Sequence, residues 1–458
     1  LSVTNQRRHG ESPKREEPPR NGSMSACVHT DVTPSWRRPF RVAAGALVLI
    51  PLMSPIPQAL SSAGASREPE ASPGADFPEV VVFFIDAGGG HRSAAQALVA
   101  AAEEQGCPFR FAPVSLQEVL APFDFTRRLT GVPLEQVYNL LIRRRWTGFL
   151  VPLLRALHFL VAGMHGRLVR AVAAHLATRR PVAVVSVMPN FNAVLRDAVR
   201  AAHPGVPFIV VMTDWADFPP HFWIEPGVDL LITGSEEGVR QAGALGLSPD
   251  RVHRVSGMLL HPRFSQVRDA GMRNAVRHDL GISREAFVLL VMFGGKGSAE
   301  MEPLCARLLA PGRPAWHVVA LCGDNPSLYA RLMALAATTE GRLHPLGFTD
   351  RVSDYLAAAD LLVTKPGPGS LAEAFHMRVP VVAARDRYTV PQERFNARMV
   401  EERGLGVIVH HWRDIPEAAA RLARDPAALG LLRRKLEALP ANHALEEVLA
   451  IVAERSRP

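Results

Sequence analysis

A glycine-rich turn followed by a histidine opens the regular part of the sequence. Gly88-Gly89-Gly90-His91 comes directly after the apolar run Val80–Ile85 and begins an Ala-rich helical stretch. An imidazole at such a helix start can take a proton from an acceptor hydroxyl, with a pKa expected near the working pH. His91 is therefore a candidate general base, and the alternative is an ordinary polar histidine at a helix N-terminus. The turn lacks the third glycine of a dinucleotide fingerprint.

A second turn, rich in proline and glycine, carries the strongest local signal for a phosphate-bearing ligand. It reads Thr364-Lys365-Pro366-Gly367-Pro368-Gly369-Ser370-Leu371-Ala372-Glu373-Ala374, with a helix expected from about Ser370. Such a turn directs backbone N–H groups and a helix N-terminus at a diphosphate. Glu373, expected in the first helical turn, is then placed to bind a ribose diol. The alternative is a plain turn in which Ser370 caps the helix and Glu373 completes a capping box.

Two further polar groups also follow apolar runs. The first is Met212-Thr213-Asp214-Trp215, with His221 and Trp223 a few residues later, and the second is the run 389–396. Side chains in the second run are of the kind that hydrogen-bond sugar hydroxyls, although they cap helices equally well. These side chains are Gln392, Glu393 and Asn396.

The runs that position these groups are continuously apolar, as expected for buried parallel strands, and they alternate with helical stretches. Each of the two series begins with a strand that ends in glycines, and Gly294-Gly295-Lys296-Gly297 closes the first strand of the second series. The expected strands are Val80–Ile85, Val182–Val187, Phe208–Met212, Asp229–Thr233 and Arg254–Ser256, then Phe287–Phe293, Trp316–Cys322, Arg342–Leu346, Asp360–Thr364 and Val379–Ala383.

This alternation predicts an α/β protein with two Rossmann-like domains that face a cleft, where ligands bind in such folds. We expect the first domain at residues 79–262 and the second at residues 283–435. The last helical stretch, residues 436–458, is expected to pack back across the cleft.

Composition narrows the class of protein and of partner. The 458 residues carry a net charge of +8 and an average hydrophobic content of 48%, which favours a globular protein with an anionic partner. The four cysteines have no paired or metal-ligand spacing, which is typical of reduced thiols in a cytosolic protein. No apolar run reaches 18 residues.

Residues 1–78 differ in composition from the rest. Residues 1–38 are polar and rich in Pro and Arg, and the short apolar run Val42–Met53 with small residues behind it imitates a secretory signal. We interpret the segment as a disordered leader or a misassigned start, with Met24 as a plausible first residue.

A basic and apolar segment, residues 127–180, interrupts the first domain. It holds ten arginines and a single acidic residue, interleaved with large apolar side chains; Arg143, Arg144, Arg145 and Trp146 form its densest cluster. This mixture is typical of a surface helix that lies in an anionic membrane interface. The alternative is a pair of core helices with solvated arginine faces. Nucleic acid is a poorer fit, because no binding motif accompanies the charge.

The ordered series of motifs resembles glycosyltransferase family 28, and most closely its monogalactosyldiacylglycerol synthases and bacterial diacylglycerol glucosyltransferases. The resemblance spans residues 80–415. Its matching motifs are Asp86–Leu98, Thr213-Asp214 with His221 and Trp223, Gly257–Phe264, Phe293-Gly294-Gly295, Cys322–Asn325, Gly347-Phe348-Thr349, Asp360–Ala374 and Gln392–Asn396.

The resemblance implies a GT-B fold with the acceptor site in the first half, the UDP-sugar site in the second, and inversion at the anomeric carbon. It implies that His91 and Asp214 are catalytic. The sequence contains no Asp-x-Asp pair, so we expect no metal-chelated diphosphate and no cofactor besides the donor substrate. The implied acceptor-side residues are Gly89, Gly90, His221 and Trp223. The implied donor-side residues are Gly294, Gly295, Asn325, Phe348, Gly367, Gly369, Ser370, Glu373, Gln392 and Glu393.

The expected protein is an enzyme that moves a hexose to a lipid hydroxyl, with diacylglycerol as the first candidate, at the cytoplasmic face of a membrane. Polyprenyl-linked or lipid A-like acceptors are alternatives within the same class. A UDP-sugar 2-epimerase shares the fold, but it requires no lipid surface. A non-catalytic UDP-sugar binding protein is the third possibility, and product formation would exclude it.

Overall fold

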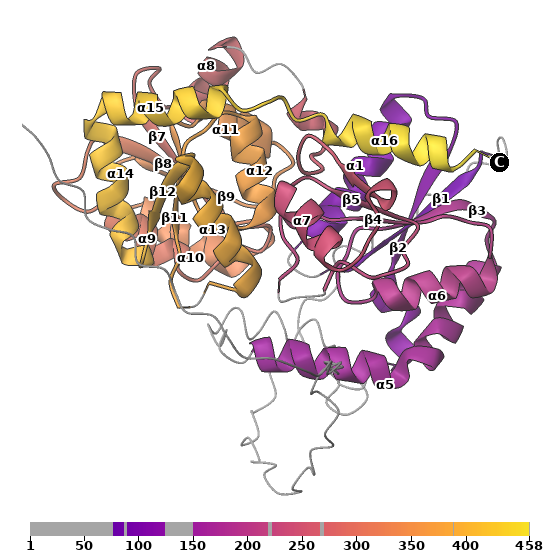
Figure 1. Cartoon of the computed structure of the whole chain (residues 1–458). Coiled ribbons are helices and arrows are strands. Elements are labelled where there is room, and N and C mark those ends of the chain that lie inside the picture. The colour runs from indigo at the N-terminus through magenta and orange to yellow at the C-terminus, as the bar shows by residue number, and fades with distance from the viewer. Residues whose placement is uncertain are drawn as a thin grey trace, which may run out of the picture. The chain divides into compact units, whose positions relative to one another are not determined.

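The computed structural model describes residues 77–86, 89–123, 150–218, 222–265, 270–387 and 389–457. These residues form two six-stranded sheets, each wholly parallel, with helices between most successive strands (Figure 1). Continuous apolar runs produce such sheets because helices cover both faces of each strand. The predicted α/β class with two Rossmann-like units is confirmed.

The first sheet has the strand order β2-β1-β3-β4-β5-β6. The order in which the strands are added reverses between β1 and β3, which are parallel and lie side by side. The strands are β1 (Glu79–Phe84), β2 (Arg110–Ser115), β3 (Pro181–Ser186), β4 (Phe208–Val211), β5 (Leu230–Thr233) and β6 (Val252–Arg254). The helices between them are α1 (Gly90–Glu104), α2 (Leu116–Val119), η1 (Ala121–Phe123), α5 (Leu150–Ala177), α6 (Asn192–Ala202), α7 (Glu236–Ala244) and η3 (Pro249–Arg251).

The second sheet has the order β12-β11-β10-β7-β8-β9, the doubly wound order of a dinucleotide-binding fold. Its strands are β7 (Phe287–Met292), β8 (Trp316–Leu321), β9 (Leu343–Leu346), β10 (Leu361–Thr364), β11 (Val381–Ala384) and β12 (Gly406–Val409). The helices from β6 onward are η4 (Pro262–Phe264), α8 (Ala270–Asp279), α9 (Met301–Leu308), α10 (Pro326–Ala336), α11 (Val352–Ala358), α12 (Pro368–His376), α13 (Pro391–Arg403), η5 (Trp412–Asp414), α14 (Ile415–Arg424), α15 (Pro426–Glu437) and α16 (Ala444–Arg455).

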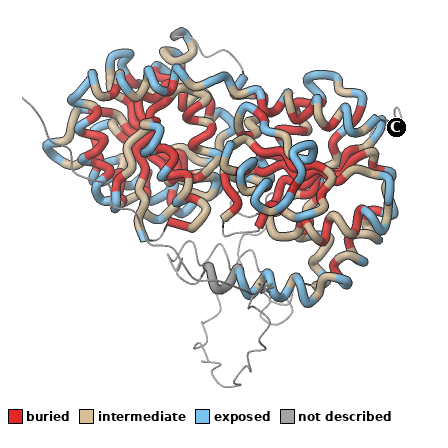
Figure 2. The backbone as a smooth tube through the Cα atoms, in the orientation of Figure 1, coloured by how far each residue is buried: buried red, intermediate tan, exposed pale blue. Residues whose placement is uncertain are grey.

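Alternate residues of each strand point to opposite faces, so each sheet has two cores (Figure 2). In β1, Val81 and Phe83 join one core while Val80 and Val82 join the other. The second of these cores also contains the apolar face of α16, which packs beside α1 (Figure 1). The last helix of the chain therefore completes the core of the first sheet.

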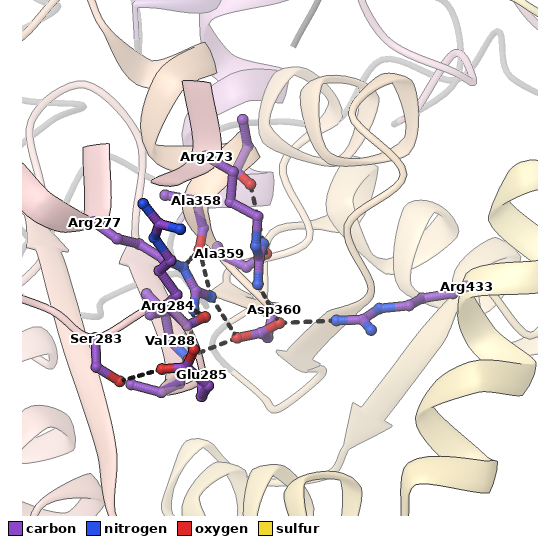
Figure 3. A network of polar contacts seen from close by, with 12 residues as sticks. Arg273, Arg277, Ser283, Arg284, Glu285, Val288, Ala358, Ala359, Asp360 and Arg433 are labelled. Atoms are coloured by element: carbon purple, nitrogen blue, oxygen red, sulfur yellow. Dashed lines mark hydrogen bonds and ion pairs between the residues drawn. The ribbon is translucent and has the colours of Figure 1, made fainter. Parts of the chain in front are cut away.

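A buried carboxylate ties the amino-terminal side of the second sheet to its flanking helices (Figure 3). Asp360 lies just before β10 and accepts hydrogen bonds from Arg273 of α8 at 2.7 Å, Arg277 at 2.9 Å and Arg433 of α15 at 3.0 Å. The backbone N–H of Val288 donates to the same carboxylate at 2.9 Å. This network lies at the opposite ends of the strands from the glycine turns. We therefore expect it to stabilise the fold and not to bind a ligand.

Within the described ranges, no helix is long and apolar enough to cross a membrane.

Candidate functional site

Both glycine turns lie where the strand order of their sheet reverses. Gly89 and His91 follow β1, which is paired with β3, and Gly294 follows β7, which is paired with β10. In open parallel sheets the carboxyl ends of the strands at such a reversal form the ligand crevice. The fold thus places the first glycine turn of each series at the expected edge of its sheet.

His91 is held by two oxygens on neighbouring strands. Its Nδ1 lies 2.9 Å from the carbonyl oxygen of Val187, after β3, and 2.9 Å from Oγ1 of Thr213, after β4. A carbonyl only accepts hydrogen bonds, so Nδ1 carries the proton of the neutral ring. Nε2 then holds the lone pair, and among the described residues it makes no hydrogen bond. The tautomer is the one a general base at Nε2 requires.

The pKa of His91 is lower than predicted. Burial lowers it to about 4, and the Val187 hydrogen bond offsets only part of that effect. The expectation of a pKa near the working pH is therefore wrong for the unliganded protein, because a helix start recognised in sequence says nothing about the covering side chains. At neutral pH the ring is uncharged and ready to accept a proton.

Asp214 and Trp223 form the next layer around His91. The indole N–H of Trp223 donates to Oδ2 of Asp214 at 2.9 Å, and the indole ring lies 5.7 Å from the His91 ring, centroid to centroid. Trp223 is only 1% exposed. Contact of Trp223 with the acceptor or membrane stays a prediction; in the structure its ring is placed to orient Asp214 and His91.

Asp217 organises the loop that carries Trp223, and it was missed from sequence. Its carboxylate accepts the backbone N–H groups of Phe222 at 2.8 Å and Trp223 at 2.9 Å. An aspartate that bridges a loop five residues onward leaves no regular spacing to detect. Its position after Asp214 and before two prolines was the only available signal.

The proline-glycine turn differs from its prediction in where the helix begins. Gly367 is the N-cap residue of α12, and Pro368 is its first residue. Ser370 is therefore already helical and caps nothing, and Glu373 lies in the second turn, so the capping-box alternative is wrong. The N–H groups of Gly369 and Ser370 belong to the first turn, where no carbonyl of the helix reaches them. Those groups are available to an anion.

Glu373 has the environment of a ligand-binding carboxylate. Burial raises its pKa to about 7, opposed by the positive charge of Arg263 in η4. In the described part of the chain its oxygens accept no hydrogen bond. A partly buried carboxylate without protein donors is suited to bind two hydroxyl donors of a ligand.

This carboxylate leads to a prediction about donor binding and pH. Glu373→Gln is expected to weaken UDP-glucose binding by about tenfold to a hundredfold, the range for a hydrogen bond to a charged group. In the wild-type protein, affinity should rise with pH through about 7, because the ionised carboxylate accepts both hydroxyl hydrogens. Calorimetry from pH 6 to 8 measures both effects. Equal affinity of the two proteins at pH 8 would remove Glu373 from the ribose site.

The amino-terminal turn of α13 contacts the same loop. Glu393 forms an ion pair with Lys365 at 2.9 Å, and Asn396 donates to the carbonyl of Pro366 at 3.0 Å. Oε1 of Gln392 is buried and has no hydrogen-bond partner among the described residues. Asn396 thus supports the loop, whereas Gln392 retains an unsatisfied polar atom, as a ligand contact requires.

Glycines in the loop after β7 and in the loop after β8 allow these two loops to approach closely. A side chain at Gly323 would place Cβ 2.2 Å from the carbonyl oxygen of Gly295, and Gly294 has a positive φ of 79°. The side chain of Asn325 accepts from Leu328 N–H as a helix cap and donates to Lys296 O at 3.1 Å. Donor binding by Asn325 stays a prediction; in the structure its amide joins the two loops.

Phe348 stands apart from the other candidates. It follows β9 and is 78% exposed, unusually high for a phenylalanine. An uncovered aromatic ring offers a flat surface for stacking against a planar ligand group.

Aromatic pairs connect the Asp214 loop with the donor-side helices. The ring centroids of Trp215 and of Phe375 on α12 are 5.6 Å apart, and those of Phe218 and of Phe395 on α13 are 6.0 Å apart. The charges of Glu393 and Lys365 also act on Asp214. The acceptor-side and donor-side candidates therefore belong to one site.

Several predicted residues lie outside the described part of the chain. They are His221, Arg143, Arg144, Arg145 and Trp146, together with residues 1–76 of the leader. Within the described ranges, no group of three or more His, Cys, Asp or Glu side chains is arranged to hold a metal ion.

Comparison with curated proteins finds diacylglycerol glycosyltransferases. The chain is 26% identical over 358 residues to a chloroplastic monogalactosyldiacylglycerol synthase of Spinacia oleracea, covering 75% of this chain and 65% of that protein. It is 27% identical over 254 residues to a processive diacylglycerol beta-glucosyltransferase of Bacillus pumilus, covering 55% and 63%. The chain thus spans just under two thirds of the length of these relatives. No protein-family model matches the chain.

Comparison with solved structures supports the fold. A UDP-glucosyltransferase of Polygonum tinctorium aligns with a TM-score of 0.52 and 16% identity, over 84% of this chain and 99% of that chain. A putative UDP-N-acetylglucosamine 2-epimerase of Listeria monocytogenes aligns with a TM-score of 0.52 and 15% identity, over 82% and 95%. The predicted resemblance to these proteins and the GT-B fold are confirmed.

Proposed function

We propose that this GT-B protein transfers a hexose from a UDP-sugar to the hydroxyl of diacylglycerol. One observation carries the proposal. The same site contains His91, with its lone pair at Nε2, and the amide turn at Gly367–Ser370, whose N–H groups are open to an anion. The two relatives described above are named for transfer to diacylglycerol, one as a galactolipid synthase and one as a glucosyltransferase.

The proposed reaction is a direct displacement. Nε2 of His91 takes the proton of the acceptor hydroxyl while its oxygen attacks the anomeric carbon of the donor. The bond from that carbon to the UDP oxygen breaks, and UDP leaves with the electron pair. Attack opposite the leaving group converts an α-linked donor into a β-glycoside. The N–H groups of Gly369 and Ser370 stabilise the charge that develops on the diphosphate, so no metal or other cofactor is required.

The other proposed contacts follow from position. Glu373 binds the ribose and Gln392 reads the sugar hydroxyls, while Phe348 offers its ring to the uracil base. On the acceptor side, the carboxylate of Asp214 accepts a hydrogen bond from the acceptor hydroxyl. The epimerase alternative rests on fold likeness at 15% identity alone, whereas the sequence relatives favour transfer to lipid.

A radiolabel transfer assay tests the proposal. The chain is incubated with phosphatidylglycerol vesicles that contain diacylglycerol and with labelled UDP-galactose, UDP-glucose or UDP-N-acetylglucosamine in turn. Label in the lipid phase with one donor is the expected result and identifies the sugar. Free UDP without labelled lipid would reject diacylglycerol as acceptor, and a sugar with an inverted C2 centre would support epimerisation.

We further propose that the protein binds peripherally to an anionic membrane, at its cytoplasmic face, through the segment 127–180. The described part of this segment includes α5, in which the side chains of Phe159 (78%) and Leu160 (44%) are exposed. Exposed apolar side chains beside arginines suit an interface between headgroups and acyl chains. No role for nucleic acid is proposed.

The arginine cluster gives this proposal a quantitative test. Replacing Arg143, Arg144 and Arg145 together by glutamine is expected to weaken binding to phosphatidylglycerol vesicles by about a hundredfold. The reason is that each basic residue near such a surface contributes about 1 kcal/mol. Co-sedimentation at low and high salt measures the effect, and salt should weaken wild-type binding.

A variant with the same change in charge provides the control. Arg421, Arg424 and Arg434 are exposed on α14 and α15, and their joint replacement by glutamine should leave vesicle binding nearly unchanged. Equal loss in both variants would point to net charge alone, and would contradict a membrane-binding role for the segment 127–180.

A further inference from the structure

Lys365 lies where the donor-side elements meet. It directly follows β10, and its Nζ is 2.9 Å from Oε1 of Glu393 on α13. A methyl group added at Gly294 or at Gly367 would lie 3.7 Å from its Cε. The side chain therefore runs between the two glycine loops and ends at the first turn of α13.

The ammonium also acts on the acceptor side. The pKa of Asp214 is raised to about 6, chiefly by burial; the Trp223 hydrogen bond lowers it, the charges of Glu393 and Asp217 raise it, and that of Lys365 lowers it. Lys365 thus pairs directly with Glu393 of the second half, and its charge also acts on Asp214 of the first half.

Neighbouring carboxylates in a partly buried site do not both remain ionised without a cation, because each disfavours the charge on the other. The donor would add a diphosphate to the same region. Neither Asp217, whose carboxylate already receives backbone N–H groups, nor Trp223, which is neutral, supplies a positive charge.

We propose that Lys365 is a positioning residue that orients Glu393 toward the transferred sugar and keeps Asp214 ionised on the acceptor side. The inference rests on the proposed function. It extends that function by making sugar recognition and acceptor positioning depend on the same side chain.

The first test measures the charge state of Asp214 without any turnover. The indole N–H of Trp223 donates to Asp214, so its ¹⁵N–¹H resonance in ¹⁵N-tryptophan-labelled protein reports the ionisation of that carboxylate. Trp223→Phe assigns the resonance. In the wild-type protein we expect an inflection near pH 6.

Two substitutions should move this inflection in opposite directions. Lys365→Met removes a positive neighbour and should raise the inflection, whereas Glu393→Gln removes a negative neighbour and should lower it. Lys365→Arg should restore the wild-type value. Lys435→Met, which removes an exposed lysine of α15 outside the site, should leave it unchanged. A loss of structure alone would not give opposite shifts.

The second test measures the orientation of Glu393. Lys365→Met and Glu393→Gln are each expected to raise the KM for the UDP-sugar by about tenfold or more, because a hydrogen bond to a charged group is lost. Lys365→Arg should recover most of the loss, and Lys435→Met should show none.

The outcomes separate this inference from the proposed function. If the wild-type chain labels no lipid, the proposed function fails, and the resonance still tests the effect of Lys365 on Asp214. If Lys365→Met leaves both the inflection and the KM at wild-type values, Lys365 has no positioning role. A shift of the same sign in Lys365→Met and Glu393→Gln would also overturn the inference.

Discussion

His91→Ala is expected to lower kcat for lipid glycosylation by about two or more orders of magnitude while UDP-sugar affinity stays near that of the wild type. General-base catalysis contributes roughly 10²–10⁴-fold. The site provides a neutral ring with its lone pair at Nε2, whereas the donor contacts lie in the second half. Steady-state kinetics with calorimetry of UDP-sugar binding separates the two effects.

The matched control is His278→Ala, an exposed histidine at the end of α8. It should keep wild-type kcat. If His91→Ala also keeps wild-type kcat, the base role passes to Asp214, whose pKa of about 6 makes it the next proton acceptor in the site. Parallel losses of kcat and of UDP-sugar affinity would instead indicate a damaged fold.

Asp360→Ala is expected to destabilise the protein by about 3–5 kcal/mol, the cost of removing one partner from a buried ion pair. Its carboxylate is 11% exposed and faces Arg277, whose side chain is fully buried (Figure 3). Without Asp360 that guanidinium keeps its carbonyl partners but loses its negatively charged partner. Urea-induced unfolding at pH 7 measures the loss.

An exposed ion pair provides the comparison. Glu302→Ala removes the partner of Arg331, where both side chains are about 40% exposed, and should change stability by at most about 1 kcal/mol. If Asp360→Ala costs no more than this control, the network is only a surface feature.

The pH dependence of the Asp360 effect has a definite sign. Burial acts to raise the pKa of Asp360, but the Val288 N–H and two arginines outweigh it, so the pKa lies below its ordinary value. A lowered pKa contributes stability above the unfolded-state value of about 3.9, and that stability is lost as the pH falls through the folded-state value. The difference between wild type and Asp360→Ala should therefore shrink in acid.

Sequence patterns predicted the buried strands better than the edge strands. Runs such as Phe287–Phe293 are continuously apolar because helices cover both faces. In contrast, β2 (Arg110–Ser115) lies at a sheet edge and mixes polar residues and a proline, so it was missed. The strand expected at Arg254–Ser256 is β6 at Val252–Arg254, since its short polar segment carries little periodicity.

For the site, sequence placed the turns but not the chemistry of the side chains. Strand-glycine-helix order located His91 and the Gly367 loop because topology brings them to the sheet edge. The lowered pKa of His91, the raised pKa of Glu373 and the bonds of Asn325 depend on groups distant in sequence. The prolines around Gly367 also hid the true start of α12.

The packing of α16 against α1 has a consequence for biosynthesis. The helix that carries His91 is covered by apolar residues of α16, which follow the whole second sheet in the sequence. The first sheet is translated before the second, but it cannot complete its core until α16 has left the ribosome. A chain that stops before Ala444 would leave α1 uncovered, and its acceptor side would remain an unfinished folding intermediate.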